Sequence, residues 1–420
     1  MTRDISPGPA PEAASTTTGD GGPKASGRLV AMDGLRFAAA AAVLLYHFTA
    51  TSTVSSYWGV DPERAFPLLN EVTRYGWLGV ELFFMISGFV ILLSADGRGV
   101  AGFVASRVGR LFPAYWACVV LTAGLQQVWS GGRRTSLTET MVNLTMVQDL
   151  FEVTGLQVVF WTLLVELKFY LLVLVVLALG PLTRNRVLAF AALWPLAGWA
   201  AQELGARWLT EWLVPDYAPY FAVGMLLFLA YRDGFDLITS TLLVGGLALS
   251  VMRVLDASGR ASELQGVPVN PVVTVLVLLA SVVAVWATTL RTASGPPRTI
   301  VTVLGTAGAL TYPVYLVHTQ FGYAVIDMLA HETTRTVALF AAGALSLGLA
   351  LAIHYGVERP TSTRLRRAVQ TGLLRCSDAL RTRGALPAGS PGGASRAEAA
   401  RTAGTAGTAE VAEVAEARAR

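Results

Sequence analysis

Charged residues are scarce in this chain of 420 residues, where Asp, Glu, Lys and Arg make up 14 % and hydrophobic residues 53 %. A soluble globular domain carries about a quarter charged residues, so the scarcity excludes an ordinary soluble protein. Cysteine occurs only as Cys118 and Cys376, one in an apolar and one in a polar stretch, which excludes a disulfide framework. We therefore expect an integral membrane protein, and we expect no cleavable signal peptide.

Signatures of several other protein classes are also missing. The sequence has no glycine-rich phosphate loop and no Gly-x-Ser-x-Gly elbow. Its four histidines follow no metal-ligand spacing, so we expect no metal. The formal net charge of +4 comes from arginines gathered in short loops and near the C-terminus, as membrane topology requires. We therefore expect no nucleic-acid partner.

Apolar segments recur along the chain at a length that suits membrane-spanning helices in a lipid bilayer. We count ten, and we predict an all-α, polytopic membrane protein with about ten transmembrane helices around a polar cavity. Arginine-rich loops alternate with balanced or acidic ones, so the positive-inside rule predicts that both termini lie in the cytoplasm. We expect the protein in the plasma membrane. The segments are 30–52, 75–94, 111–130, 156–179, 187–202, 217–231, 236–253, 271–290, 299–328 and 336–356.

The two ends of the chain differ in composition from this apolar part. Residues 1–27 are rich in Pro, Gly, Ser and Thr, and we expect them to be a disordered tail. From residue 361 the chain becomes polar and then repetitive, so we expect 361–420 to be a cytoplasmic low-complexity tail. A single transmembrane domain, residues 28–360, lies between them.

The first apolar segment carries three ionisable side chains, Asp33, Arg36 and His47. A charge at bilayer depth costs about 3 kcal/mol, so such a helix should face a protein interior or a water-filled cavity. An ideal helix turns about 100° per residue, which brings Arg36 and His47 to within about 20° of one face. Asp33 lies on the same side of the helix. This polar stripe is the first indication of a functional site.

Later segments carry further polar side chains, each with a structural and a functional interpretation. Glu81 is either a structural partner, for example of Arg36, or a direct participant in chemistry. Arg107 and Arg110 are spaced i, i+3 and project from one side of a helix. They either anchor that helix at lipid headgroups or recognise phosphate with their planar guanidinium groups.

Two more candidates, Glu166 and His318, lie in the fourth and ninth segments. Glu166 is predicted at a depth similar to that of His47, where it would orient the imidazole and stabilise its charged form for general base catalysis. The alternative is a buried salt bridge without a catalytic role. His318 is either a hydrogen-bonded core residue or a catalytic group, in a segment that Pro313 should kink or break.

Six segments, taken in their order and spacing, resemble the acyltransferase 3 family, integral membrane enzymes that move acyl groups onto sugars and other hydroxyl acceptors. The resemblance extends over residues 28–360. Arg36 and His47 fit the family's Arg–ten residues–His signature, and Arg107 and Arg110 fit its Arg-x-x-Arg signature. Glu166 falls in its Trp–Glu–Phe-Tyr segment. The six are DGLRFAAAAAVLLYHF (33–48), GVELFFMISGF (79–89), RVGRLFPAYW (107–116), FWTLLVELKFY (160–170), LTYPVYLVH (310–318) and VERP (357–360).

The resemblance implies an O-acyltransferase that takes acyl-CoA, expected to be acetyl-CoA, from the cytoplasm. Arg36, Arg107 and Arg110 would bind this donor. His47 would deprotonate the acceptor hydroxyl or carry the acyl group transiently, and Glu166 would assist it as a second catalytic residue. The side chains expected to support them are Asp33, Glu81 and His318.

The implied acceptor is a hydroxyl-bearing glycan, glycolipid or small molecule, with envelope polysaccharide and macrolide-type metabolites both open. Two positions depart from the family pattern, Glu81 in place of Asp and Thr311 in place of Ser. We expect both to affect the geometry of the site and not the activity itself. The rival function from another class is a multi-span transporter of a glycan or small molecule, because intramembrane charges also line transport pathways.

Overall fold

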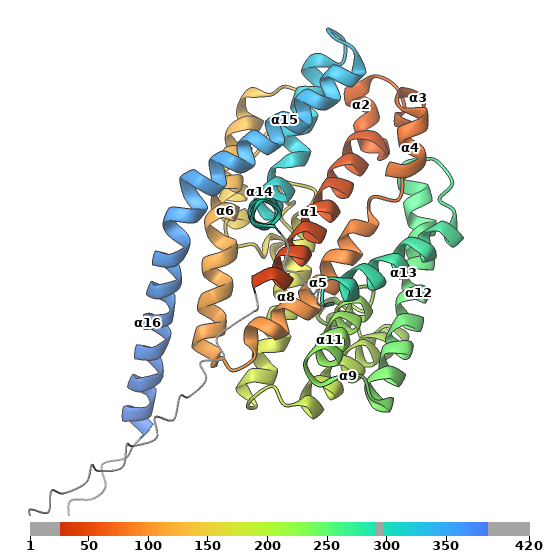
Figure 1. Cartoon of the computed structure of the whole chain (residues 1–420). Coiled ribbons are helices and arrows are strands. Elements are labelled where there is room, and N and C mark those ends of the chain that lie inside the picture. Colours follow the sequence, from red (N-terminus) through yellow and green to blue (C-terminus); the bar gives the residue numbers. More distant parts are fainter. Residues whose placement is uncertain (1–25, 291–296, 385–420) are drawn as a thin grey trace, which may run out of the picture.

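The structure is a computed structural model of the chain, and it describes residues 26–290 and 297–384 (Figure 1). The described residues form helices and no strand, which confirms the all-α prediction. Seven of these helices are long and apolar enough to cross a membrane, or eight if the bent pair α10 and α11 is one span. The chain is therefore a multi-pass membrane protein, whereas the predicted count of ten spans is not confirmed.

Each of the ten predicted segments coincides with a helix in the described part of the chain. Helix α13 has 17 residues and is about 25 Å long, shorter than a hydrocarbon core of about 30 Å. The ten helices are α1 (Ser26–Thr49), α5 (Leu78–Ala95), α6 (Val100–Val128), α8 (Phe160–Ala178), α9 (Arg184–Glu203), α11 (Ala218–Asp233), α12 (Leu237–Gln265), α13 (Pro271–Ala287), α14 (Arg298–Leu329) and α15 (Arg335–Ile353).

Short helices fill the connections between the long ones, and local sequence explains where several begin. Ser136 and Glu139 form a capping box at the start of α7, in which each side chain bonds to the other's backbone N–H. The Ser136 amide and the Arg133 guanidinium together lower the pKa of Glu139 to about 2. The short helices are η1 (Ser52–Val54), α2 (Ser55–Trp58), α3 (Pro62–Ala65), α4 (Pro67–Thr73), α7 (Leu137–Asn143), η2 (Gln148–Phe151) and α10 (Arg207–Leu213).

Glycines allow the helices around the site to approach closely. A Cβ atom on Gly88 of α5 would overlap the backbone carbonyl of Phe221, and one on Gly224 of α11 would overlap that of Met85. Gly79 of α5 lies against the carbonyl of Ala39 in α1 in the same way. Small residues at helix crossings are typical of membrane bundles, and here they let α5 pack closely against both α1 and α11.

Helix α14 packs against both α1 and α15 and brings the ninth segment into the interior (Figure 1). It is a single helix that continues through Pro313, so of the predicted kink or break the break does not occur. Its residues from Leu310 to Thr319 are all buried. The segment that carries His318 is therefore part of the core of the bundle.

The chain continues beyond α15 as a π-helical turn, η3 (His354–Glu358), and then α16 (Arg359–Gly384). Figure 1 shows α16 running beside α6 at one edge of the bundle. Gly109 of α6 makes this contact close, since its missing Cβ would lie 2.9 Å from the carbonyl oxygen of Ser362. The predicted tail 361–420 thus begins inside a packed helix. The predicted disorder of residues 1–25 and 385–420 lies outside the described residues.

Candidate active site

Two histidines from different helices meet where α1 packs against α14. Nε2 of His318 lies 3.2 Å from Nδ1 of His47, and the ring centroids are 5.0 Å apart. His318 is fully buried, and Phe48 and Tyr315 pack their rings against it. His318, for which the sequence left a structural and a catalytic role open, is therefore the direct neighbour of His47, the predicted base.

Backbone carbonyls around this pair determine which nitrogens carry hydrogen. Nδ1 of His318 lies 2.8 Å from the carbonyl oxygen of Tyr315, so Nδ1 is the donor and Nε2 of the neutral ring has a lone pair. Nδ1 of His47 lies 2.9 Å from the carbonyl oxygen of Val43 and also faces His318, so we assign its hydrogen to Nδ1. Nε2 of His47 keeps its lone pair and makes no hydrogen bond to any described residue.

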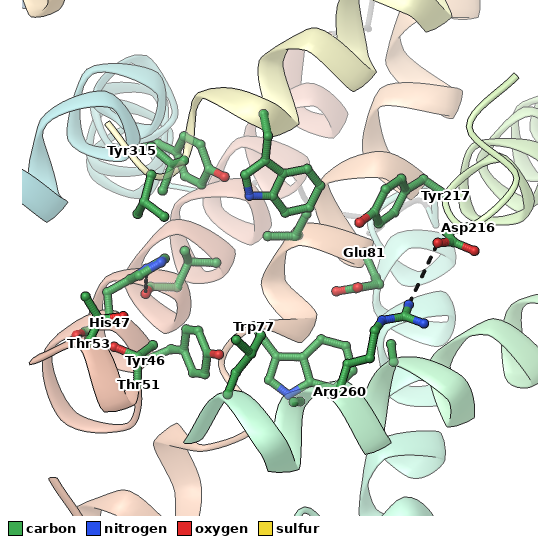
Figure 2. A pocket seen from close by; sticks show the side chains of 18 of the residues that line it. Tyr46, His47, Thr51, Thr53, Trp77, Glu81, Asp216, Tyr217, Arg260 and Tyr315 are labelled. Carbon is green, nitrogen blue, oxygen red and sulfur yellow. Dashed lines mark hydrogen bonds and ion pairs between the residues drawn. The ribbon is translucent and has the colours of Figure 1, made fainter. Parts of the chain in front are cut away.

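A cavity of about 290 Å³, here called the His47 cavity, opens beside this ring (Figure 2). Figure 2 shows His47 at one end and the Glu81 carboxylate pointing into the cavity from the other side. Glu81 is 5 % exposed, and its Oε2 atom has no hydrogen-bond partner among the described residues. The aromatic side chains of the wall are Tyr46, Trp77, Trp161, Tyr217, Tyr220, Tyr315 and Tyr323.

An ion-pair cluster lines the same cavity beyond Glu81. Asp216 lies 3.4 Å from Arg253 and 3.9 Å from Arg260, and both arginines come from α12 (Figure 2). Neither arginine lies within ion-pair distance of Glu81 in the described part of the chain. The cavity therefore offers one unpaired buried carboxylate among aromatic rings, with cationic and anionic groups at its far end.

A second and smaller cavity of about 50 Å³, here called the inner chamber, adjoins the first. Arg36, Glu166 and Tyr312 line it, and the Tyr312 hydroxyl and Arg36 Nε have no hydrogen-bond partner among the described residues. Val80 and Tyr315 line both cavities, so these two side chains stand between them. The Tyr315 hydroxyl is held 2.8 Å from the hydroxyl of Thr162.

The predicted pairing of Glu166 with His47 is wrong, because Glu166 belongs to the inner chamber. Its Oε1 atom accepts hydrogen bonds from Ser87 at 2.8 Å and from the Tyr170 hydroxyl at 2.6 Å. The cause is the connection before α8, which folds back into the bundle. The hydroxyl of Tyr115, midway along α6, donates to the carbonyl of Asn143 at 2.6 Å. Helix α8 therefore begins below the surface, and Glu166 lies deeper than its count from the surface predicted.

The three predicted donor-binding arginines gather near the inner chamber, with different partners. Arg36 interacts electrostatically with Arg110, Glu166 and Asp33. The Arg107 guanidinium lies 5.8 Å from the ring centroid of Tyr170, which is cation–π distance. Arg110 lies 3.6 Å from Glu358 of η3. The arrangement joins the first, third and fourth predicted segments at one polar centre.

Asp33 has a packing position at the α1–α14 crossing. A Cβ atom on Gly308 of α14 would lie 2.6 Å from the γ-carbon of Asp33, so the glycine makes room for this carboxylate. Among the described residues, no group of three or more His, Cys, Asp or Glu side chains is arranged to hold a metal ion.

Sequence reasoning missed the side chains that hold the others in place. Thr162 holds the Tyr315 hydroxyl, and Tyr170 fixes Glu166. The spacing carried part of this information, because Tyr315 and His318 are i, i+3 on one helix face and Glu166 and Tyr170 are i, i+4. No pattern within one helix indicated that Thr162 would meet Tyr315.

These features define a multi-pass helical membrane protein with a histidine pair at one cavity and arginines at another. The sequence profile of the acyltransferase 3 family, described as an acyltransferase domain, matches residues 29–355. The chain belongs to this family and is an acyltransferase of the kind that transfers groups other than aminoacyl groups. No curated protein and no solved structure matches it.

Proposed function

We propose that the chain transfers an acyl group, acetyl in the first place, from acyl-CoA to a hydroxyl of a carbohydrate-containing acceptor. Envelope polysaccharide, a glycolipid and a macrolide-type metabolite are the acceptor classes considered. The observation that carries the proposal is the free Nε2 lone pair of His47 at the wall of an aromatic cavity next to an arginine-lined chamber.

In the proposed reaction, Nε2 of His47 removes the proton of the acceptor hydroxyl as its oxygen attacks the thioester carbonyl. The tetrahedral intermediate collapses, the carbon–sulfur bond breaks, and the imidazolium returns the proton to the CoA thiolate. The products are an ester and free CoA. In the variant with an acyl-histidine intermediate, Nε2 attacks the thioester carbonyl, the carbon–sulfur bond breaks and CoA thiolate leaves. The acceptor hydroxyl then attacks the acyl carbonyl, the bond to Nε2 breaks, and the hydroxyl proton passes to the CoA thiolate.

His318 supports His47 through the other ring nitrogen. Its Nε2 lone pair accepts from Nδ1–H of His47, which keeps the ring oriented and favours the tautomer with a basic Nε2. When His47 takes up a proton, this contact and the Val43 carbonyl stabilise the imidazolium. A neutral imidazole thus takes the role that the sequence assigned to the carboxylate of Glu166.

The donor is proposed to enter past Arg107 and Arg110 and to extend through the inner chamber. From Arg36 to His47, eleven residues of α1 rise about 16 Å. The pantetheine arm of CoA has about a dozen chain bonds, as many as four residues of extended peptide, which span about 14 Å. Phosphates held near Arg36 therefore allow the thioester to approach His47, provided that Tyr315 moves aside.

The acceptor is proposed to occupy the His47 cavity. Aromatic rings there offer flat apolar surfaces, and the unpartnered Glu81 oxygen accepts a hydrogen bond from a second hydroxyl of the acceptor. The cavity is built from the C-terminal parts of α1, α12 and α14 and the N-terminal parts of α5, α8 and α11. With both chain termini in the cytoplasm, this is the outer half of the bundle, so the acceptor would bind from outside.

Activity of purified protein in detergent tests the proposal. We expect wild-type protein to release free CoA from acetyl-CoA and to acetylate envelope glycans or metabolites extracted from a deletion strain, detected by mass spectrometry. His47→Ala should lower the rate about 10²- to 10⁴-fold, the usual contribution of a positioned acid–base group. His331→Ala, an exposed histidine, is the matched control and should retain full activity.

Full acyl transfer by folded His47→Ala protein would disprove the mechanism. A wild-type protein that moves a glycan across proteoliposomes and acylates nothing would instead favour the transporter, because a transporter needs no donor.

A further inference from the structure

An apolar groove on the outside of the bundle, here called the side groove, is separate from both cavities. It has a volume of about 900 Å³ and lies between α6, α15 and α16. Trp116 and Val120 of α6 and Leu349 and Ala352 of α15 are among its apolar walls. Val120 is 59 % exposed and Trp116 40 %. None of its lining residues lines the His47 cavity or the inner chamber.

One end of the side groove is basic. Arg364 of α16 is the single charged residue among its lining residues. Arg364 is exposed and forms no hydrogen bond or ion pair with any described residue, and Arg367 lies one turn further on the same helix. The Arg364 guanidinium therefore lies at the side groove without an anionic partner among the described residues.

The side groove extends from an apolar helix, α15, to an arginine-rich helix, α16. Helix α15 is apolar along its length, whereas α16 carries Arg359, Arg364, Arg366 and Arg367 within nine residues. In a membrane protein this change marks the boundary between hydrocarbon and headgroups, where arginines meet lipid phosphates. The family match ends at residue 355, so α16 and its arginines lie beyond it.

We propose that the side groove binds an anionic glycerophospholipid, with its phosphate at Arg364 and one acyl chain along the apolar wall toward Trp116. From Arg364 back to Leu349, fifteen residues rise about 22 Å along the helices. One leaflet contributes about 15 Å of hydrocarbon, so an acyl chain fits within this length. A second copy of the chain fits poorly here, because a two-fold contact would bring two basic α16 faces together.

Lipid binding to the purified full-length chain tests this inference without using catalysis. Native mass spectrometry in detergent would count bound phosphatidylglycerol and phosphatidylcholine with identical acyl chains. We expect one tightly held phosphatidylglycerol, bound at least about fivefold more tightly than phosphatidylcholine, the ratio that one arginine near an anionic headgroup provides. Arg364→Gln should remove that preference. Arg375→Gln, on the same helix outside the side groove, is the charge-matched control.

A variant that fills the side groove tests the binding of the lipid acyl chain independently of the charge of Arg364. Val120→Trp keeps Arg364 and places a large ring where the acyl chain would lie, at a residue exposed enough to accept it. We expect it to lose the bound lipid altogether. Equal lipid retention by Arg364→Gln and Arg375→Gln would overturn the proposal, as would equal affinity for both lipids. A dimer that buries the side groove without lipid would overturn it in favour of a second copy.

Discussion

One ring nitrogen of His318 is hydrogen-bonded to the backbone of its own helix, and the other contacts His47. The role of His318 is therefore to position the His47 side chain. We expect His318→Phe to lower kcat about 10- to 100-fold while the KM values for donor and acceptor change little. This loss is smaller than removal of the base itself, since the Val43 carbonyl still orients the His47 ring.

Steady-state kinetics of purified His318→Phe and His318→Gln proteins checks this expectation. Gln offers an amide oxygen that accepts from Nδ1–H of His47, so it should recover part of kcat. Equal losses in both variants, or a rise in KM alone, would contradict a positioning role.

Arg36 lines the inner chamber, and its Nε atom forms no hydrogen bond with any residue that the structure describes. We expect Arg36→Lys to raise the KM for acyl-CoA about tenfold or more, because a lysine keeps the charge but loses the planar pair of donors for phosphate. The KM for the acceptor should stay unchanged. Initial rates at varied acyl-CoA, with Arg375→Lys as control, measure this. A change in the KM for the acceptor alone would contradict a role of Arg36 in binding the donor.

The positions of single residues were predictable where the spacing within one helix was enough to determine them. The face shared by Arg36 and His47 follows from residue spacing, and both residues line cavities. The partner of His47 was not predictable in this way, because helix spacing says nothing about which neighbour lies alongside. Depth counting failed for Glu166, since it assumed that α8 starts at the surface, whereas Phe160 packs on Tyr115 within the bundle.

At the scale of elements, the crossing of α5 and α11 depends on Gly88 and Gly224, each of which lies against the backbone of the other helix. We expect Gly88→Val to lower stability by about 1–3 kcal/mol, the usual cost of overpacking. The variant should melt at a lower temperature in detergent. Gly343→Val on α15, where no side chain or backbone of another described helix lies within 4 Å of the missing Cβ, is the control. Equal melting temperatures would show that the crossing relaxes freely.

Helices with apolar sequences were predictable from hydropathy, and each predicted segment coincides with a helix. Helix α16 was taken for part of a polar tail because composition hides its spacing. Leu365, Val369 and Leu373 recur every four residues and give it one apolar face. The short helices α7 and α10 have seven residues each, too few for a periodic signal.

The orientation of the whole molecule can be tested with its own cysteines. Cys118 is buried and Cys376 on α16 is exposed. If both termini face the cytoplasm, a membrane-impermeant maleimide should label the protein only after cells are permeabilised. A Ser56→Cys variant, at an exposed position in the connection after α1, should be labelled in intact cells. The reverse pattern would invert the assignment of donor and acceptor sides.

The shared wall of Val80 and Tyr315 has a consequence for the electrochemistry of the cell. A protein that admits polar ligands from both faces of a bilayer risks becoming a proton leak. We infer that Tyr315, 6 % exposed and held by Thr162, blocks proton movement between the two cavities. We expect proteoliposomes with Tyr315→Ala to lose a pH gradient faster than wild type, measured with a trapped pH-sensitive dye, whereas Tyr315→Phe retains the ring and holds the gradient. Equal decay in all three would show that the block to protons lies elsewhere.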